Sequence, residues 1–336
     1  MFWYTIRRLI GAVGLLLVMS IVTFLIFYAT PTDPARLTCG KNCTPTGIEQ
    51  NRKYLGLDKP ITTQYLNFVG GLFHDRKFPA DKELQKARPD LILTCHAPCL
   101  GYSPLHNEEV WTYIKPKIPV TISIVTFGFI LWLTSGVLLG IVAALFRGRT
   151  LDRLLVSGAL LFYSFPTFFV SLLLLQLVVY QFNWMQTPTY TPISAGVGNW
   201  LYNLFLPSLT LALVFAAAYI RLTRAYMLET MGEDYLRTAR AKGVRERKVV
   251  FKHTLRAALT PIVTIAGLDF GILLAGAPIT ETVFSFQGLG YATVQAVQIF
   301  DLPVIVVIVL LAAVFVVLAN LVVDLLYGVI DPRVRY

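Results

Sequence analysis

The sequence predicts an all-α integral membrane protein with six transmembrane helices, and three observations support that fold class. Hydrophobic residues make up 56% of the chain and charged residues only 14%, and the mean hydropathy of +0.64 excludes an ordinary soluble domain. Six apolar runs are long enough to cross about 30 Å of hydrocarbon. Lys and Arg gather in alternate connections between those runs, as expected of a chain that crosses a membrane repeatedly.

The predicted spans are one run near the N-terminus and five runs after residue 117. They are Leu9–Ala29, Ile118–Phe146, Leu154–Tyr180, Leu204–Arg221, Thr260–Phe284 and Leu302–Ile330. The first is too long for a cleaved signal peptide, so it is predicted to remain as an anchor. Pro166 is expected to bend the third span, because proline removes a helical hydrogen bond. The fourth is the shortest, and Pro207 interrupts its start.

Charge placement orients these spans. Positive residues precede the first span, separate the second from the third, follow the sixth, and number ten between Arg221 and Arg256. The connections at 181–203 and 285–301 contain no Lys or Arg. Since short cytoplasmic loops retain positive charge, both termini are predicted to be cytoplasmic. The segment at 30–117 then lies outside, and its length exempts it from the charge rule.

The expected domain organisation follows from these spans. Residues 1–29 form the cytoplasmic N-terminus and anchor, 30–117 form an extracytoplasmic segment, 118–330 form a five-helix core, and 331–336 form a cytoplasmic tail. Within the core, residues 227–259 make a basic cytoplasmic loop. Taken alone, that loop has the composition of a segment that adheres to anionic lipid headgroups.

All four cysteines lie in the outer segment, as CGKNC and CHAPC. They are Cys39, Cys43, Cys95 and Cys99. An oxidising compartment favours disulfides over a four-thiolate metal site, and two three-residue spacers are only weakly zinc-like. The sequence therefore predicts a small disulfide-stapled insertion after the first helix, with the pairing open among three possibilities.

The basic loop is predicted to form two helices. Glu233 and Asp234 begin the first, where the helix dipole favours acids, and Gly243 follows its end. Tyr235, Leu236 and Ala239 share one face, which suits docking into a groove of another protein. A second helix is expected from Glu246 to Leu259, ending before Pro261.

Seven segments of the chain follow a pattern known from one family. The most specific are GEDYLRTARAKG (232–243), HTLRAALTP (253–261) and TETVFSFQGLG (280–290). The others are PTDP (31–34), LGLDKPITTQY (55–65), YSFPTFF (163–169) and NLVVDLLYGVIDPR (320–333). They resemble the dipeptide/oligopeptide/nickel permeases of binding-protein-dependent ABC importers, in the B-type subunit. The resemblance reaches from the first predicted span to the last.

The resemblance implies an inner-membrane permease of the ABC type I importer architecture. Its expected partners are a second homologous permease, two ATP-binding cassette ATPases or one fused protein, an extracytoplasmic substrate-binding protein, and membrane lipids. ATP and Mg would be used by the ATPases, and this chain would bind no cofactor of its own. The implied solutes are di- and oligopeptides, with nickel chelates or a related small solute as the alternative.

The basic loop would then be the coupling loop gripped by the ATPases. The implied coupling residues are Glu233, Asp234, Tyr235, Arg237, Ala239, Ala241, Gly243 and His253. Two features depart from the pattern. Gln287 stands where proline is usual, and extra residues around 36–46 and 79–104 carry all four cysteines.

Three residues are candidates for the translocation path. Asp269 lies within the fifth predicted span between Gly267 and Gly271, and an intramembrane carboxylate either lines a cavity or bonds a neighbouring helix. The other two candidates are Pro166 and Glu281. Gly288 and Gly290 are expected in an outer turn, followed by a short helix that leads into the sixth span.

The sequence offers no chemistry for an enzyme. It contains no G-x-x-x-x-G-K-[ST] phosphate-binding run, and its four His are too scattered for a metal site. The net charge of +10 is divided between two sides of a membrane, which argues against nucleic-acid binding. Two other classes stay open: a self-sufficient ion-coupled carrier that uses Asp269, and a receptor whose outer segment binds ligand.

Overall fold

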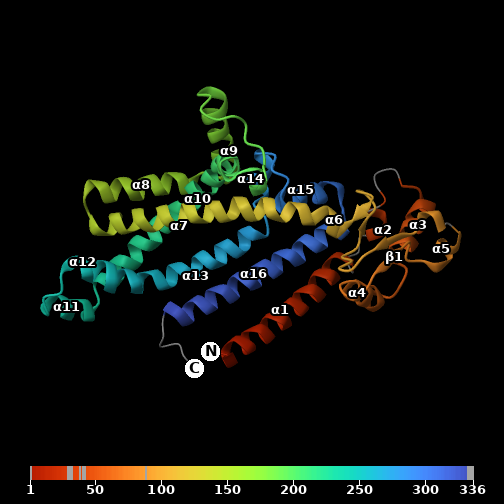
Figure 1. Ribbon diagram of the computed structural model, residues 1–336, viewed down its shortest axis with the longest axis horizontal. Helices are drawn as coiled ribbons and strands as arrows, with labels where there is room; N and C mark the ends of the chain where they lie inside the picture. Colours follow the sequence, from red (N-terminus) through yellow and green to blue (C-terminus); the bar gives the residue numbers. More distant parts are fainter. Residues whose placement is uncertain (1, 29–32, 38, 40–42, 88, 331–336) are drawn as a thin grey trace.

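The computed structural model describes residues 2–28, 33–37, 39, 43–87 and 89–330, and it is dominated by long helices lying side by side (Figure 1). The longest are α1 (Phe2–Tyr28), α7 (Ile118–Leu145), α10 (Val197–Met231), α13 (Leu255–Leu274) and α16 (Leu302–Ile330). Helix α10 packs against α7 and α13, α13 against α16, and α16 against α1. Among the described residues, five helices are long and apolar enough to cross a membrane, or six if one bent pair counts as a span. The predicted all-α membrane fold is confirmed.

The third predicted span is a broken helix rather than a bent one. Helix α8 (Thr150–Ser164) is followed by α9 (Thr167–Leu174) and the π-helical turn η3 (Leu175–Gln181), and the two halves meet at 101°. Phe165 takes an extended conformation at the break, with φ of −85° and ψ of 133°. The proline that follows it excludes the helical region for Phe165, so the helix stops there.

The fourth span is longer than predicted, because α10 continues through Pro207 without a break. The residues around this proline are buried against α7, and Ser208 Oγ donates a hydrogen bond to the Ile124 carbonyl at 3.0 Å. Spanning helices tolerate proline where neighbouring helices satisfy the polar groups nearby. The predicted span Leu204–Arg221 was therefore too short at both ends, since α10 runs from Val197 to Met231.

The predictions around Pro261 were also wrong in two respects. The helix that begins with α12 (Glu246–Lys248) does not stop at Leu259, but continues through the π-helical turn η5 (Val249–Thr254) into α13. The fifth span does not reach Phe284, because α13 ends at Leu274 and a short helix, α14 (Pro278–Val283), follows. Gly276 lies between them with φ of 129°, a conformation that side-chain-bearing residues avoid.

Glycines allow the spanning helices to approach closely. A Cβ on Gly136 of α7 would lie 2.5 Å from the Tyr219 Cβ of α10. On α13, a Cβ on Gly267 would lie 1.9 Å from the Val323 Cγ2 of α16. Small residues at such contacts let backbones pack without intervening side chains, which is how membrane helices associate.

The outer segment between α1 and α7 folds into short elements gathered at one end of the bundle (Figure 1). Its helices are α2 (Pro34–Leu37), α3 (Pro45–Leu55), α4 (Ile61–Gly70), α5 (Lys82–Ala87) and α6 (Val110–Ile114), with 3-10 turns at Pro89–Leu91 and Lys115–Lys117. Strands β1 (Arg76–Phe78) and β2 (Leu93–Cys95) pair antiparallel, as do β3 (Tyr102–Ser103) and β4 (Glu108–Glu109).

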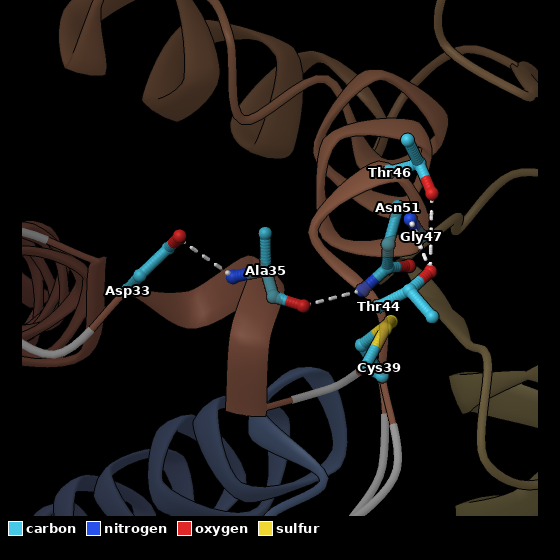
Figure 2. Close-up of a disulfide and its surroundings, with 8 residues drawn as sticks. Asp33, Ala35, Cys39, Thr44, Thr46, Gly47 and Asn51 are labelled. Atoms are coloured by element: carbon cyan, nitrogen blue, oxygen red, sulfur yellow. Dashed lines mark hydrogen bonds between the residues drawn. A yellow bond between two sulfur atoms is a disulfide. The ribbon is translucent and has the colours of Figure 1, made fainter.

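The predicted disulfides are present, and each closes a loop within its own motif. Cys39 pairs with Cys43, and Cys95 pairs with Cys99. Figure 2 shows the first pair beside the start of α3, where Thr44 Oγ1 accepts a hydrogen bond from the Gly47 amide at 3.2 Å. The disulfides therefore fix local turns and do not join distant parts of the insertion.

A buried carboxylate ties the outer segment to the bundle. Asp301, just before α16, is fully buried, and its Oδ2 accepts a hydrogen bond from Ser103 Oγ and lies 2.9 Å from His106 Nδ1. Sequence reasoning missed this contact, because Ser103 and Asp301 are nearly 200 residues apart in the chain.

Candidate coupling surface and membrane path

The basic loop forms a short helix at the end of the bundle opposite the outer segment (Figure 1). Helix α10 ends at Met231, Glu233 is the N-cap of α11 (Asp234–Ala241), and Gly243 follows with φ of 75°. The chain then enters α12 at Glu246. The predicted first helix and its glycine stop are therefore present, and the left-handed turn requires a residue without a side chain.

One residue fastens α11 to the bundle. Leu236 is fully buried, and α11 packs against η5, whose Val249 and Val250 are buried as well. Leu236 is thus unavailable to a partner, contrary to the predicted docking face. Tyr235 is 48% exposed on the same helix. Burial, followed by the charge of Glu233, raises the pKa of the Tyr235 phenol, so it stays a neutral hydrogen-bond donor at neutral pH.

An ion pair closes the turn between α11 and α12. Arg240 Nη2 lies 2.9 Å from Glu246 Oε1, and Arg240 Nε lies 3.1 Å from Glu246 Oε2. Both side chains are exposed, so this bidentate pair contributes little to stability and mainly fixes the angle between the helices. The pair was not predicted, since a separation of six residues matches no helical spacing.

The remaining predicted coupling residues lie on or near this surface. Arg237 is exposed, with its Nη1 3.5 Å from Asp234 Oδ1, and Ala241 is exposed at the end of α11. Ala239 is half-buried. His253 is also half-buried, within the π-helical turn that carries the loop into α13. That turn is closed by a hydrogen bond of 3.2 Å from Thr254 Oγ1 to the Val249 carbonyl.

A second ion pair at this end of the molecule escaped sequence reasoning. Asp152, near the start of α8, is buried and bonds Arg224 of α10 through both carboxylate oxygens, at 2.6 and 2.8 Å. The Gly148 amide donates to the same carboxylate at 2.8 Å. This pair joins the α7–α8 turn to α10.

Glu281 of α14 organises the opposite end of the core. Its carboxylate is fully buried and accepts hydrogen bonds from Thr121 Oγ1 at 2.8 Å, the Tyr291 amide at 2.8 Å and the Ala277 amide at 3.3 Å. Thr121 Oγ1 in turn accepts from the Leu289 amide at 2.8 Å. The network joins α7, α14 and α15 (Leu289–Ile299). Within this chain the Glu281 side chain has no exposed surface, and it braces the three helices from inside.

The two outer-turn glycines allow close packing around this network, Gly288 against the carboxylate and Gly290 against the backbone at the start of α14. A Cβ on Gly288 would lie 2.5 Å from both Glu281 Oε2 and Thr121 Oγ1. A Cβ on Gly290 would lie 2.6 Å from the Pro278 amide nitrogen. The predicted turn and the short helix after it are present. Gly288 has ordinary extended backbone angles, so it is needed there because a side chain would not fit.

Asp269 bonds a neighbouring helix. Tyr219 Oη of α10 donates to Asp269 Oδ2 at 2.7 Å. Tyr219 is 1% exposed, whereas Asp269 is half-buried on α13. Pro166, the other intramembrane candidate, stands at the break between α8 and α9. The path candidates Asp269, Pro166 and Glu281 therefore lie on three different elements, α13, the start of α9 and α14. No group of three or more metal-ligating side chains occurs in the described part of the chain.

Known proteins of one kind are similar to this chain along nearly its whole length. Residues 136–336 match the family model for the binding-protein-dependent transport system inner membrane component, and residues 1–125 match the model for the N-terminal part of such components. The glutathione transport system permease protein GsiC of Pectobacterium atrosepticum is 37% identical over 333 residues, covering 99% of both chains.

Two further relatives are similarly close along their full length. GsiC of Escherichia coli strain K12 is 36% identical over 341 residues, again covering 99% of both chains. A Brucella abortus protein, named for its part as permease in a peptide transport system, is 35% identical over 331 residues and 98% of both chains.

Proposed function

The chain belongs to the family of binding-protein-dependent transport system inner membrane components, and from that premise we propose that it is the permease subunit of an ATP-driven importer for glutathione or other small peptides. Members of this family are multi-pass inner-membrane subunits of transporters, not catalysts. The substrate class is supported by full-length relatives named for glutathione and peptide transport. Nickel chelates or a related small solute are the competing substrates.

The chain needs partners to do this. It pairs with a second homologous permease to enclose the path, an extracytoplasmic binding protein delivers solute, and two ATPase subunits, or one fused protein, hydrolyse ATP with Mg. Both termini lie in the cytoplasm, which puts α11 on the side of the ATPases. Positive charge at 221–256 supports that orientation.

In this proposal α11 is the lever that the ATPases move. The supporting observation is the continuous helix from Glu246 to Leu274, which joins the α11 turn to the middle of the core. Leu236 fastens α11 to this helix, while Tyr235, Arg237 and Ala241 stay exposed for contact with the ATPase. ATPase closure therefore shifts α13 as well as α11.

The path is proposed to run beside α13, with Asp269 facing it. Asp269 is only half-buried in this chain, and the hydrogen bond from Tyr219 fixes its orientation. The break at Pro166 gives α8 and α9 separate axes that can change angle between inward-open and outward-open states. Glu281 positions the outer turn and does not itself meet solute.

Reconstitution tests the proposal. The tagged chain is expected to copurify with a second permease and with ATPase subunits. The reconstituted complex with its binding protein is expected to show ATPase stimulation by glutathione or short peptides. Stimulation by a nickel chelate alone would replace the substrate assignment. Transport by this chain alone in liposomes, without ATP, would instead support an ion-coupled carrier that uses Asp269.

A further inference from the structure

A cavity of about 60 Å³ lies where the outer segment meets the ends of two spanning helices. Its walls come from α1, α4, β1 and the start of α16, and they include Phe24, Tyr28, Gln64, Phe68, Arg76 and Leu302. Most of these walls are aromatic or apolar. The cavity lies outside both the coupling surface and the proposed path.

Two cationic residues line this cavity, Lys59 and Arg76, and the more enclosed one is Arg76 of β1. Within the described residues, the Arg76 guanidinium makes no ion pair and no hydrogen bond, and its carbon lies 5.2 Å from the centre of the Phe78 ring. Burial lowers the pKa of Arg76, and the electrostatic neighbour that offsets this is Tyr28. A partly buried charge without a partner is costly, so the position favours a bound anion.

A second polar group in the cavity is also unpaired. Gln64 donates through Nε2 to the Leu57 and Lys59 carbonyls, at 3.2 and 2.7 Å. Its Oε1 is buried and accepts no hydrogen bond. This oxygen has no accessible surface, so the group that the cavity offers to a ligand is the forked cationic donor of Arg76, within mostly apolar walls. A ligand that suits the cavity carries an oxyanion.

The cavity lies at the membrane boundary. Tyr65 of α4, on the same wall, donates to Ser20 Oγ at 3.3 Å, and Ser20 is eight residues, or about 12 Å, inside the outer end of α1. Leu66 and Phe73 beside it are 68% and 73% exposed. Helix α4 therefore continues the apolar surface of the spanning helix α1, and the cavity above it is level with the lipid headgroups.

We propose that this cavity binds the phosphate of a phospholipid from the adjacent leaflet, with Arg76 and the Tyr28 hydroxyl donating to the phosphate oxygens. A guanidinium fork matches two oxygens of one phosphate, and lysine does not reproduce this geometry. The inference goes beyond the proposed function and does not depend on the transported solute.

The test measures phospholipid retained by the purified full chain, using native mass spectrometry after delipidation and addition of phosphatidylethanolamine, phosphatidylglycerol or phosphatidylcholine. Arg76→Gln is expected to lower retention of all three lipids about tenfold, because each carries the phosphate and the variant loses a charge-assisted bidentate contact. Lys77→Gln is the matched control. It removes the same charge from the neighbouring residue of β1, which is exposed and points to the other face.

Further variants keep the proposal open to refutation if Arg76→Gln folds poorly. Tyr28→Phe keeps the ring that stacks on Phe24 and is expected to lower retention severalfold, while Arg76→Lys gives an intermediate loss. Equal retention by Arg76→Gln and Lys77→Gln would overturn the proposal. So would displacement of the lipid by millimolar inorganic phosphate, which would identify a free oxyanion as the ligand. Unchanged lipid retention with lost response to the binding protein would assign Arg76 to a protein partner instead.

Discussion

Two turns at opposite ends of the core use charged residues in opposite ways. At the outer turn, the Glu281 carboxylate is fully buried, and three donors satisfy it. At the coupling end, Arg240 and Glu246 pair in the open, and α11 is fastened mainly by the buried Leu236. The outer turn is therefore built to hold one arrangement. The α11–α12 turn instead presents exposed charges and few internal contacts, which suits the coupling role proposed for α11.

The largest effect is expected from Glu281→Ala. It leaves the Thr121 hydroxyl and the Tyr291 and Ala277 amides without their acceptor, at about 1–3 kcal/mol for each unsatisfied buried group. The apparent melting temperature in detergent, measured by fluorescence-detected size exclusion, should fall sharply. Glu281→Gln keeps the shape and one acceptor and should lose less. A melting temperature equal to that of the unsubstituted chain would show that the network is not structural.

Gly288→Ala should destabilise the same turn by roughly 1–3 kcal/mol, through overpacking against Glu281 and Thr121. Backbone strain does not contribute, because Gly288 is extended, with φ of −92° and ψ of −167°. Gly158→Ala in α8 is the matched control, since a Cβ there has nothing within 4 Å. The same melting assay applies. If the two variants had the same melting temperature, the close approach at Gly288 would not matter for stability.

Gly243→Ala should affect coupling more than stability. Its φ of 75° makes a side chain strained by about 1–2 kcal/mol, enough to reduce the population with the correct turn about 5- to 30-fold. Solute uptake per ATP hydrolysed by the reconstituted complex is the measurement. Gly148→Ala is the matched control. Gly148 has nearly the same φ, 78°, and a Cβ there would also have no atom within 4 Å, but it lies in the α7–α8 turn. Equal loss of coupling in both variants would remove the special role of the α11 turn.

The smallest effect is expected at the Arg240–Glu246 pair. A double-mutant cycle with Arg240→Gln and Glu246→Gln should give an interaction energy below about 1 kcal/mol, because both groups are exposed and screened. The melting temperatures of the four proteins provide the measurement. An interaction as large as that expected at Glu281 would contradict the difference between the two ends.

Much of the fold was predictable from the sequence, because its signals are local. Apolar runs marked the spanning helices, and the glycine after α11 marked the turn. The predicted helix boundaries were wrong at Pro207 and Pro261. Proline was taken to break the helix at both positions, but α10 and α13 continue through them, because neighbouring helices pack around these positions. Pro166 was expected to bend the third span, whereas the two halves meet at 101° and α9 packs against α10 and α14, which no local rule predicts.

The candidate site was predictable only in part. Helix α11 was located from its residues. Leu236 was nevertheless assigned to an exposed docking face, because helical periodicity identifies an apolar face but not the element that covers it. The contacts of Glu281 with Thr121, and of Asp269 with Tyr219, join residues far apart in the chain. No spacing rule reaches across such separations.

The sequence by itself determined the membrane class, the approximate number of spans, the cysteine-bearing outer insertion and the family, because composition, hydropathy and motifs are properties of contiguous segments. Only the tertiary structure decided which charges are buried, which glycines allow close packing and where Arg76 lies without an anion. Those features depend on side chains brought together by folding, and the free energy of a polar group depends on what surrounds it.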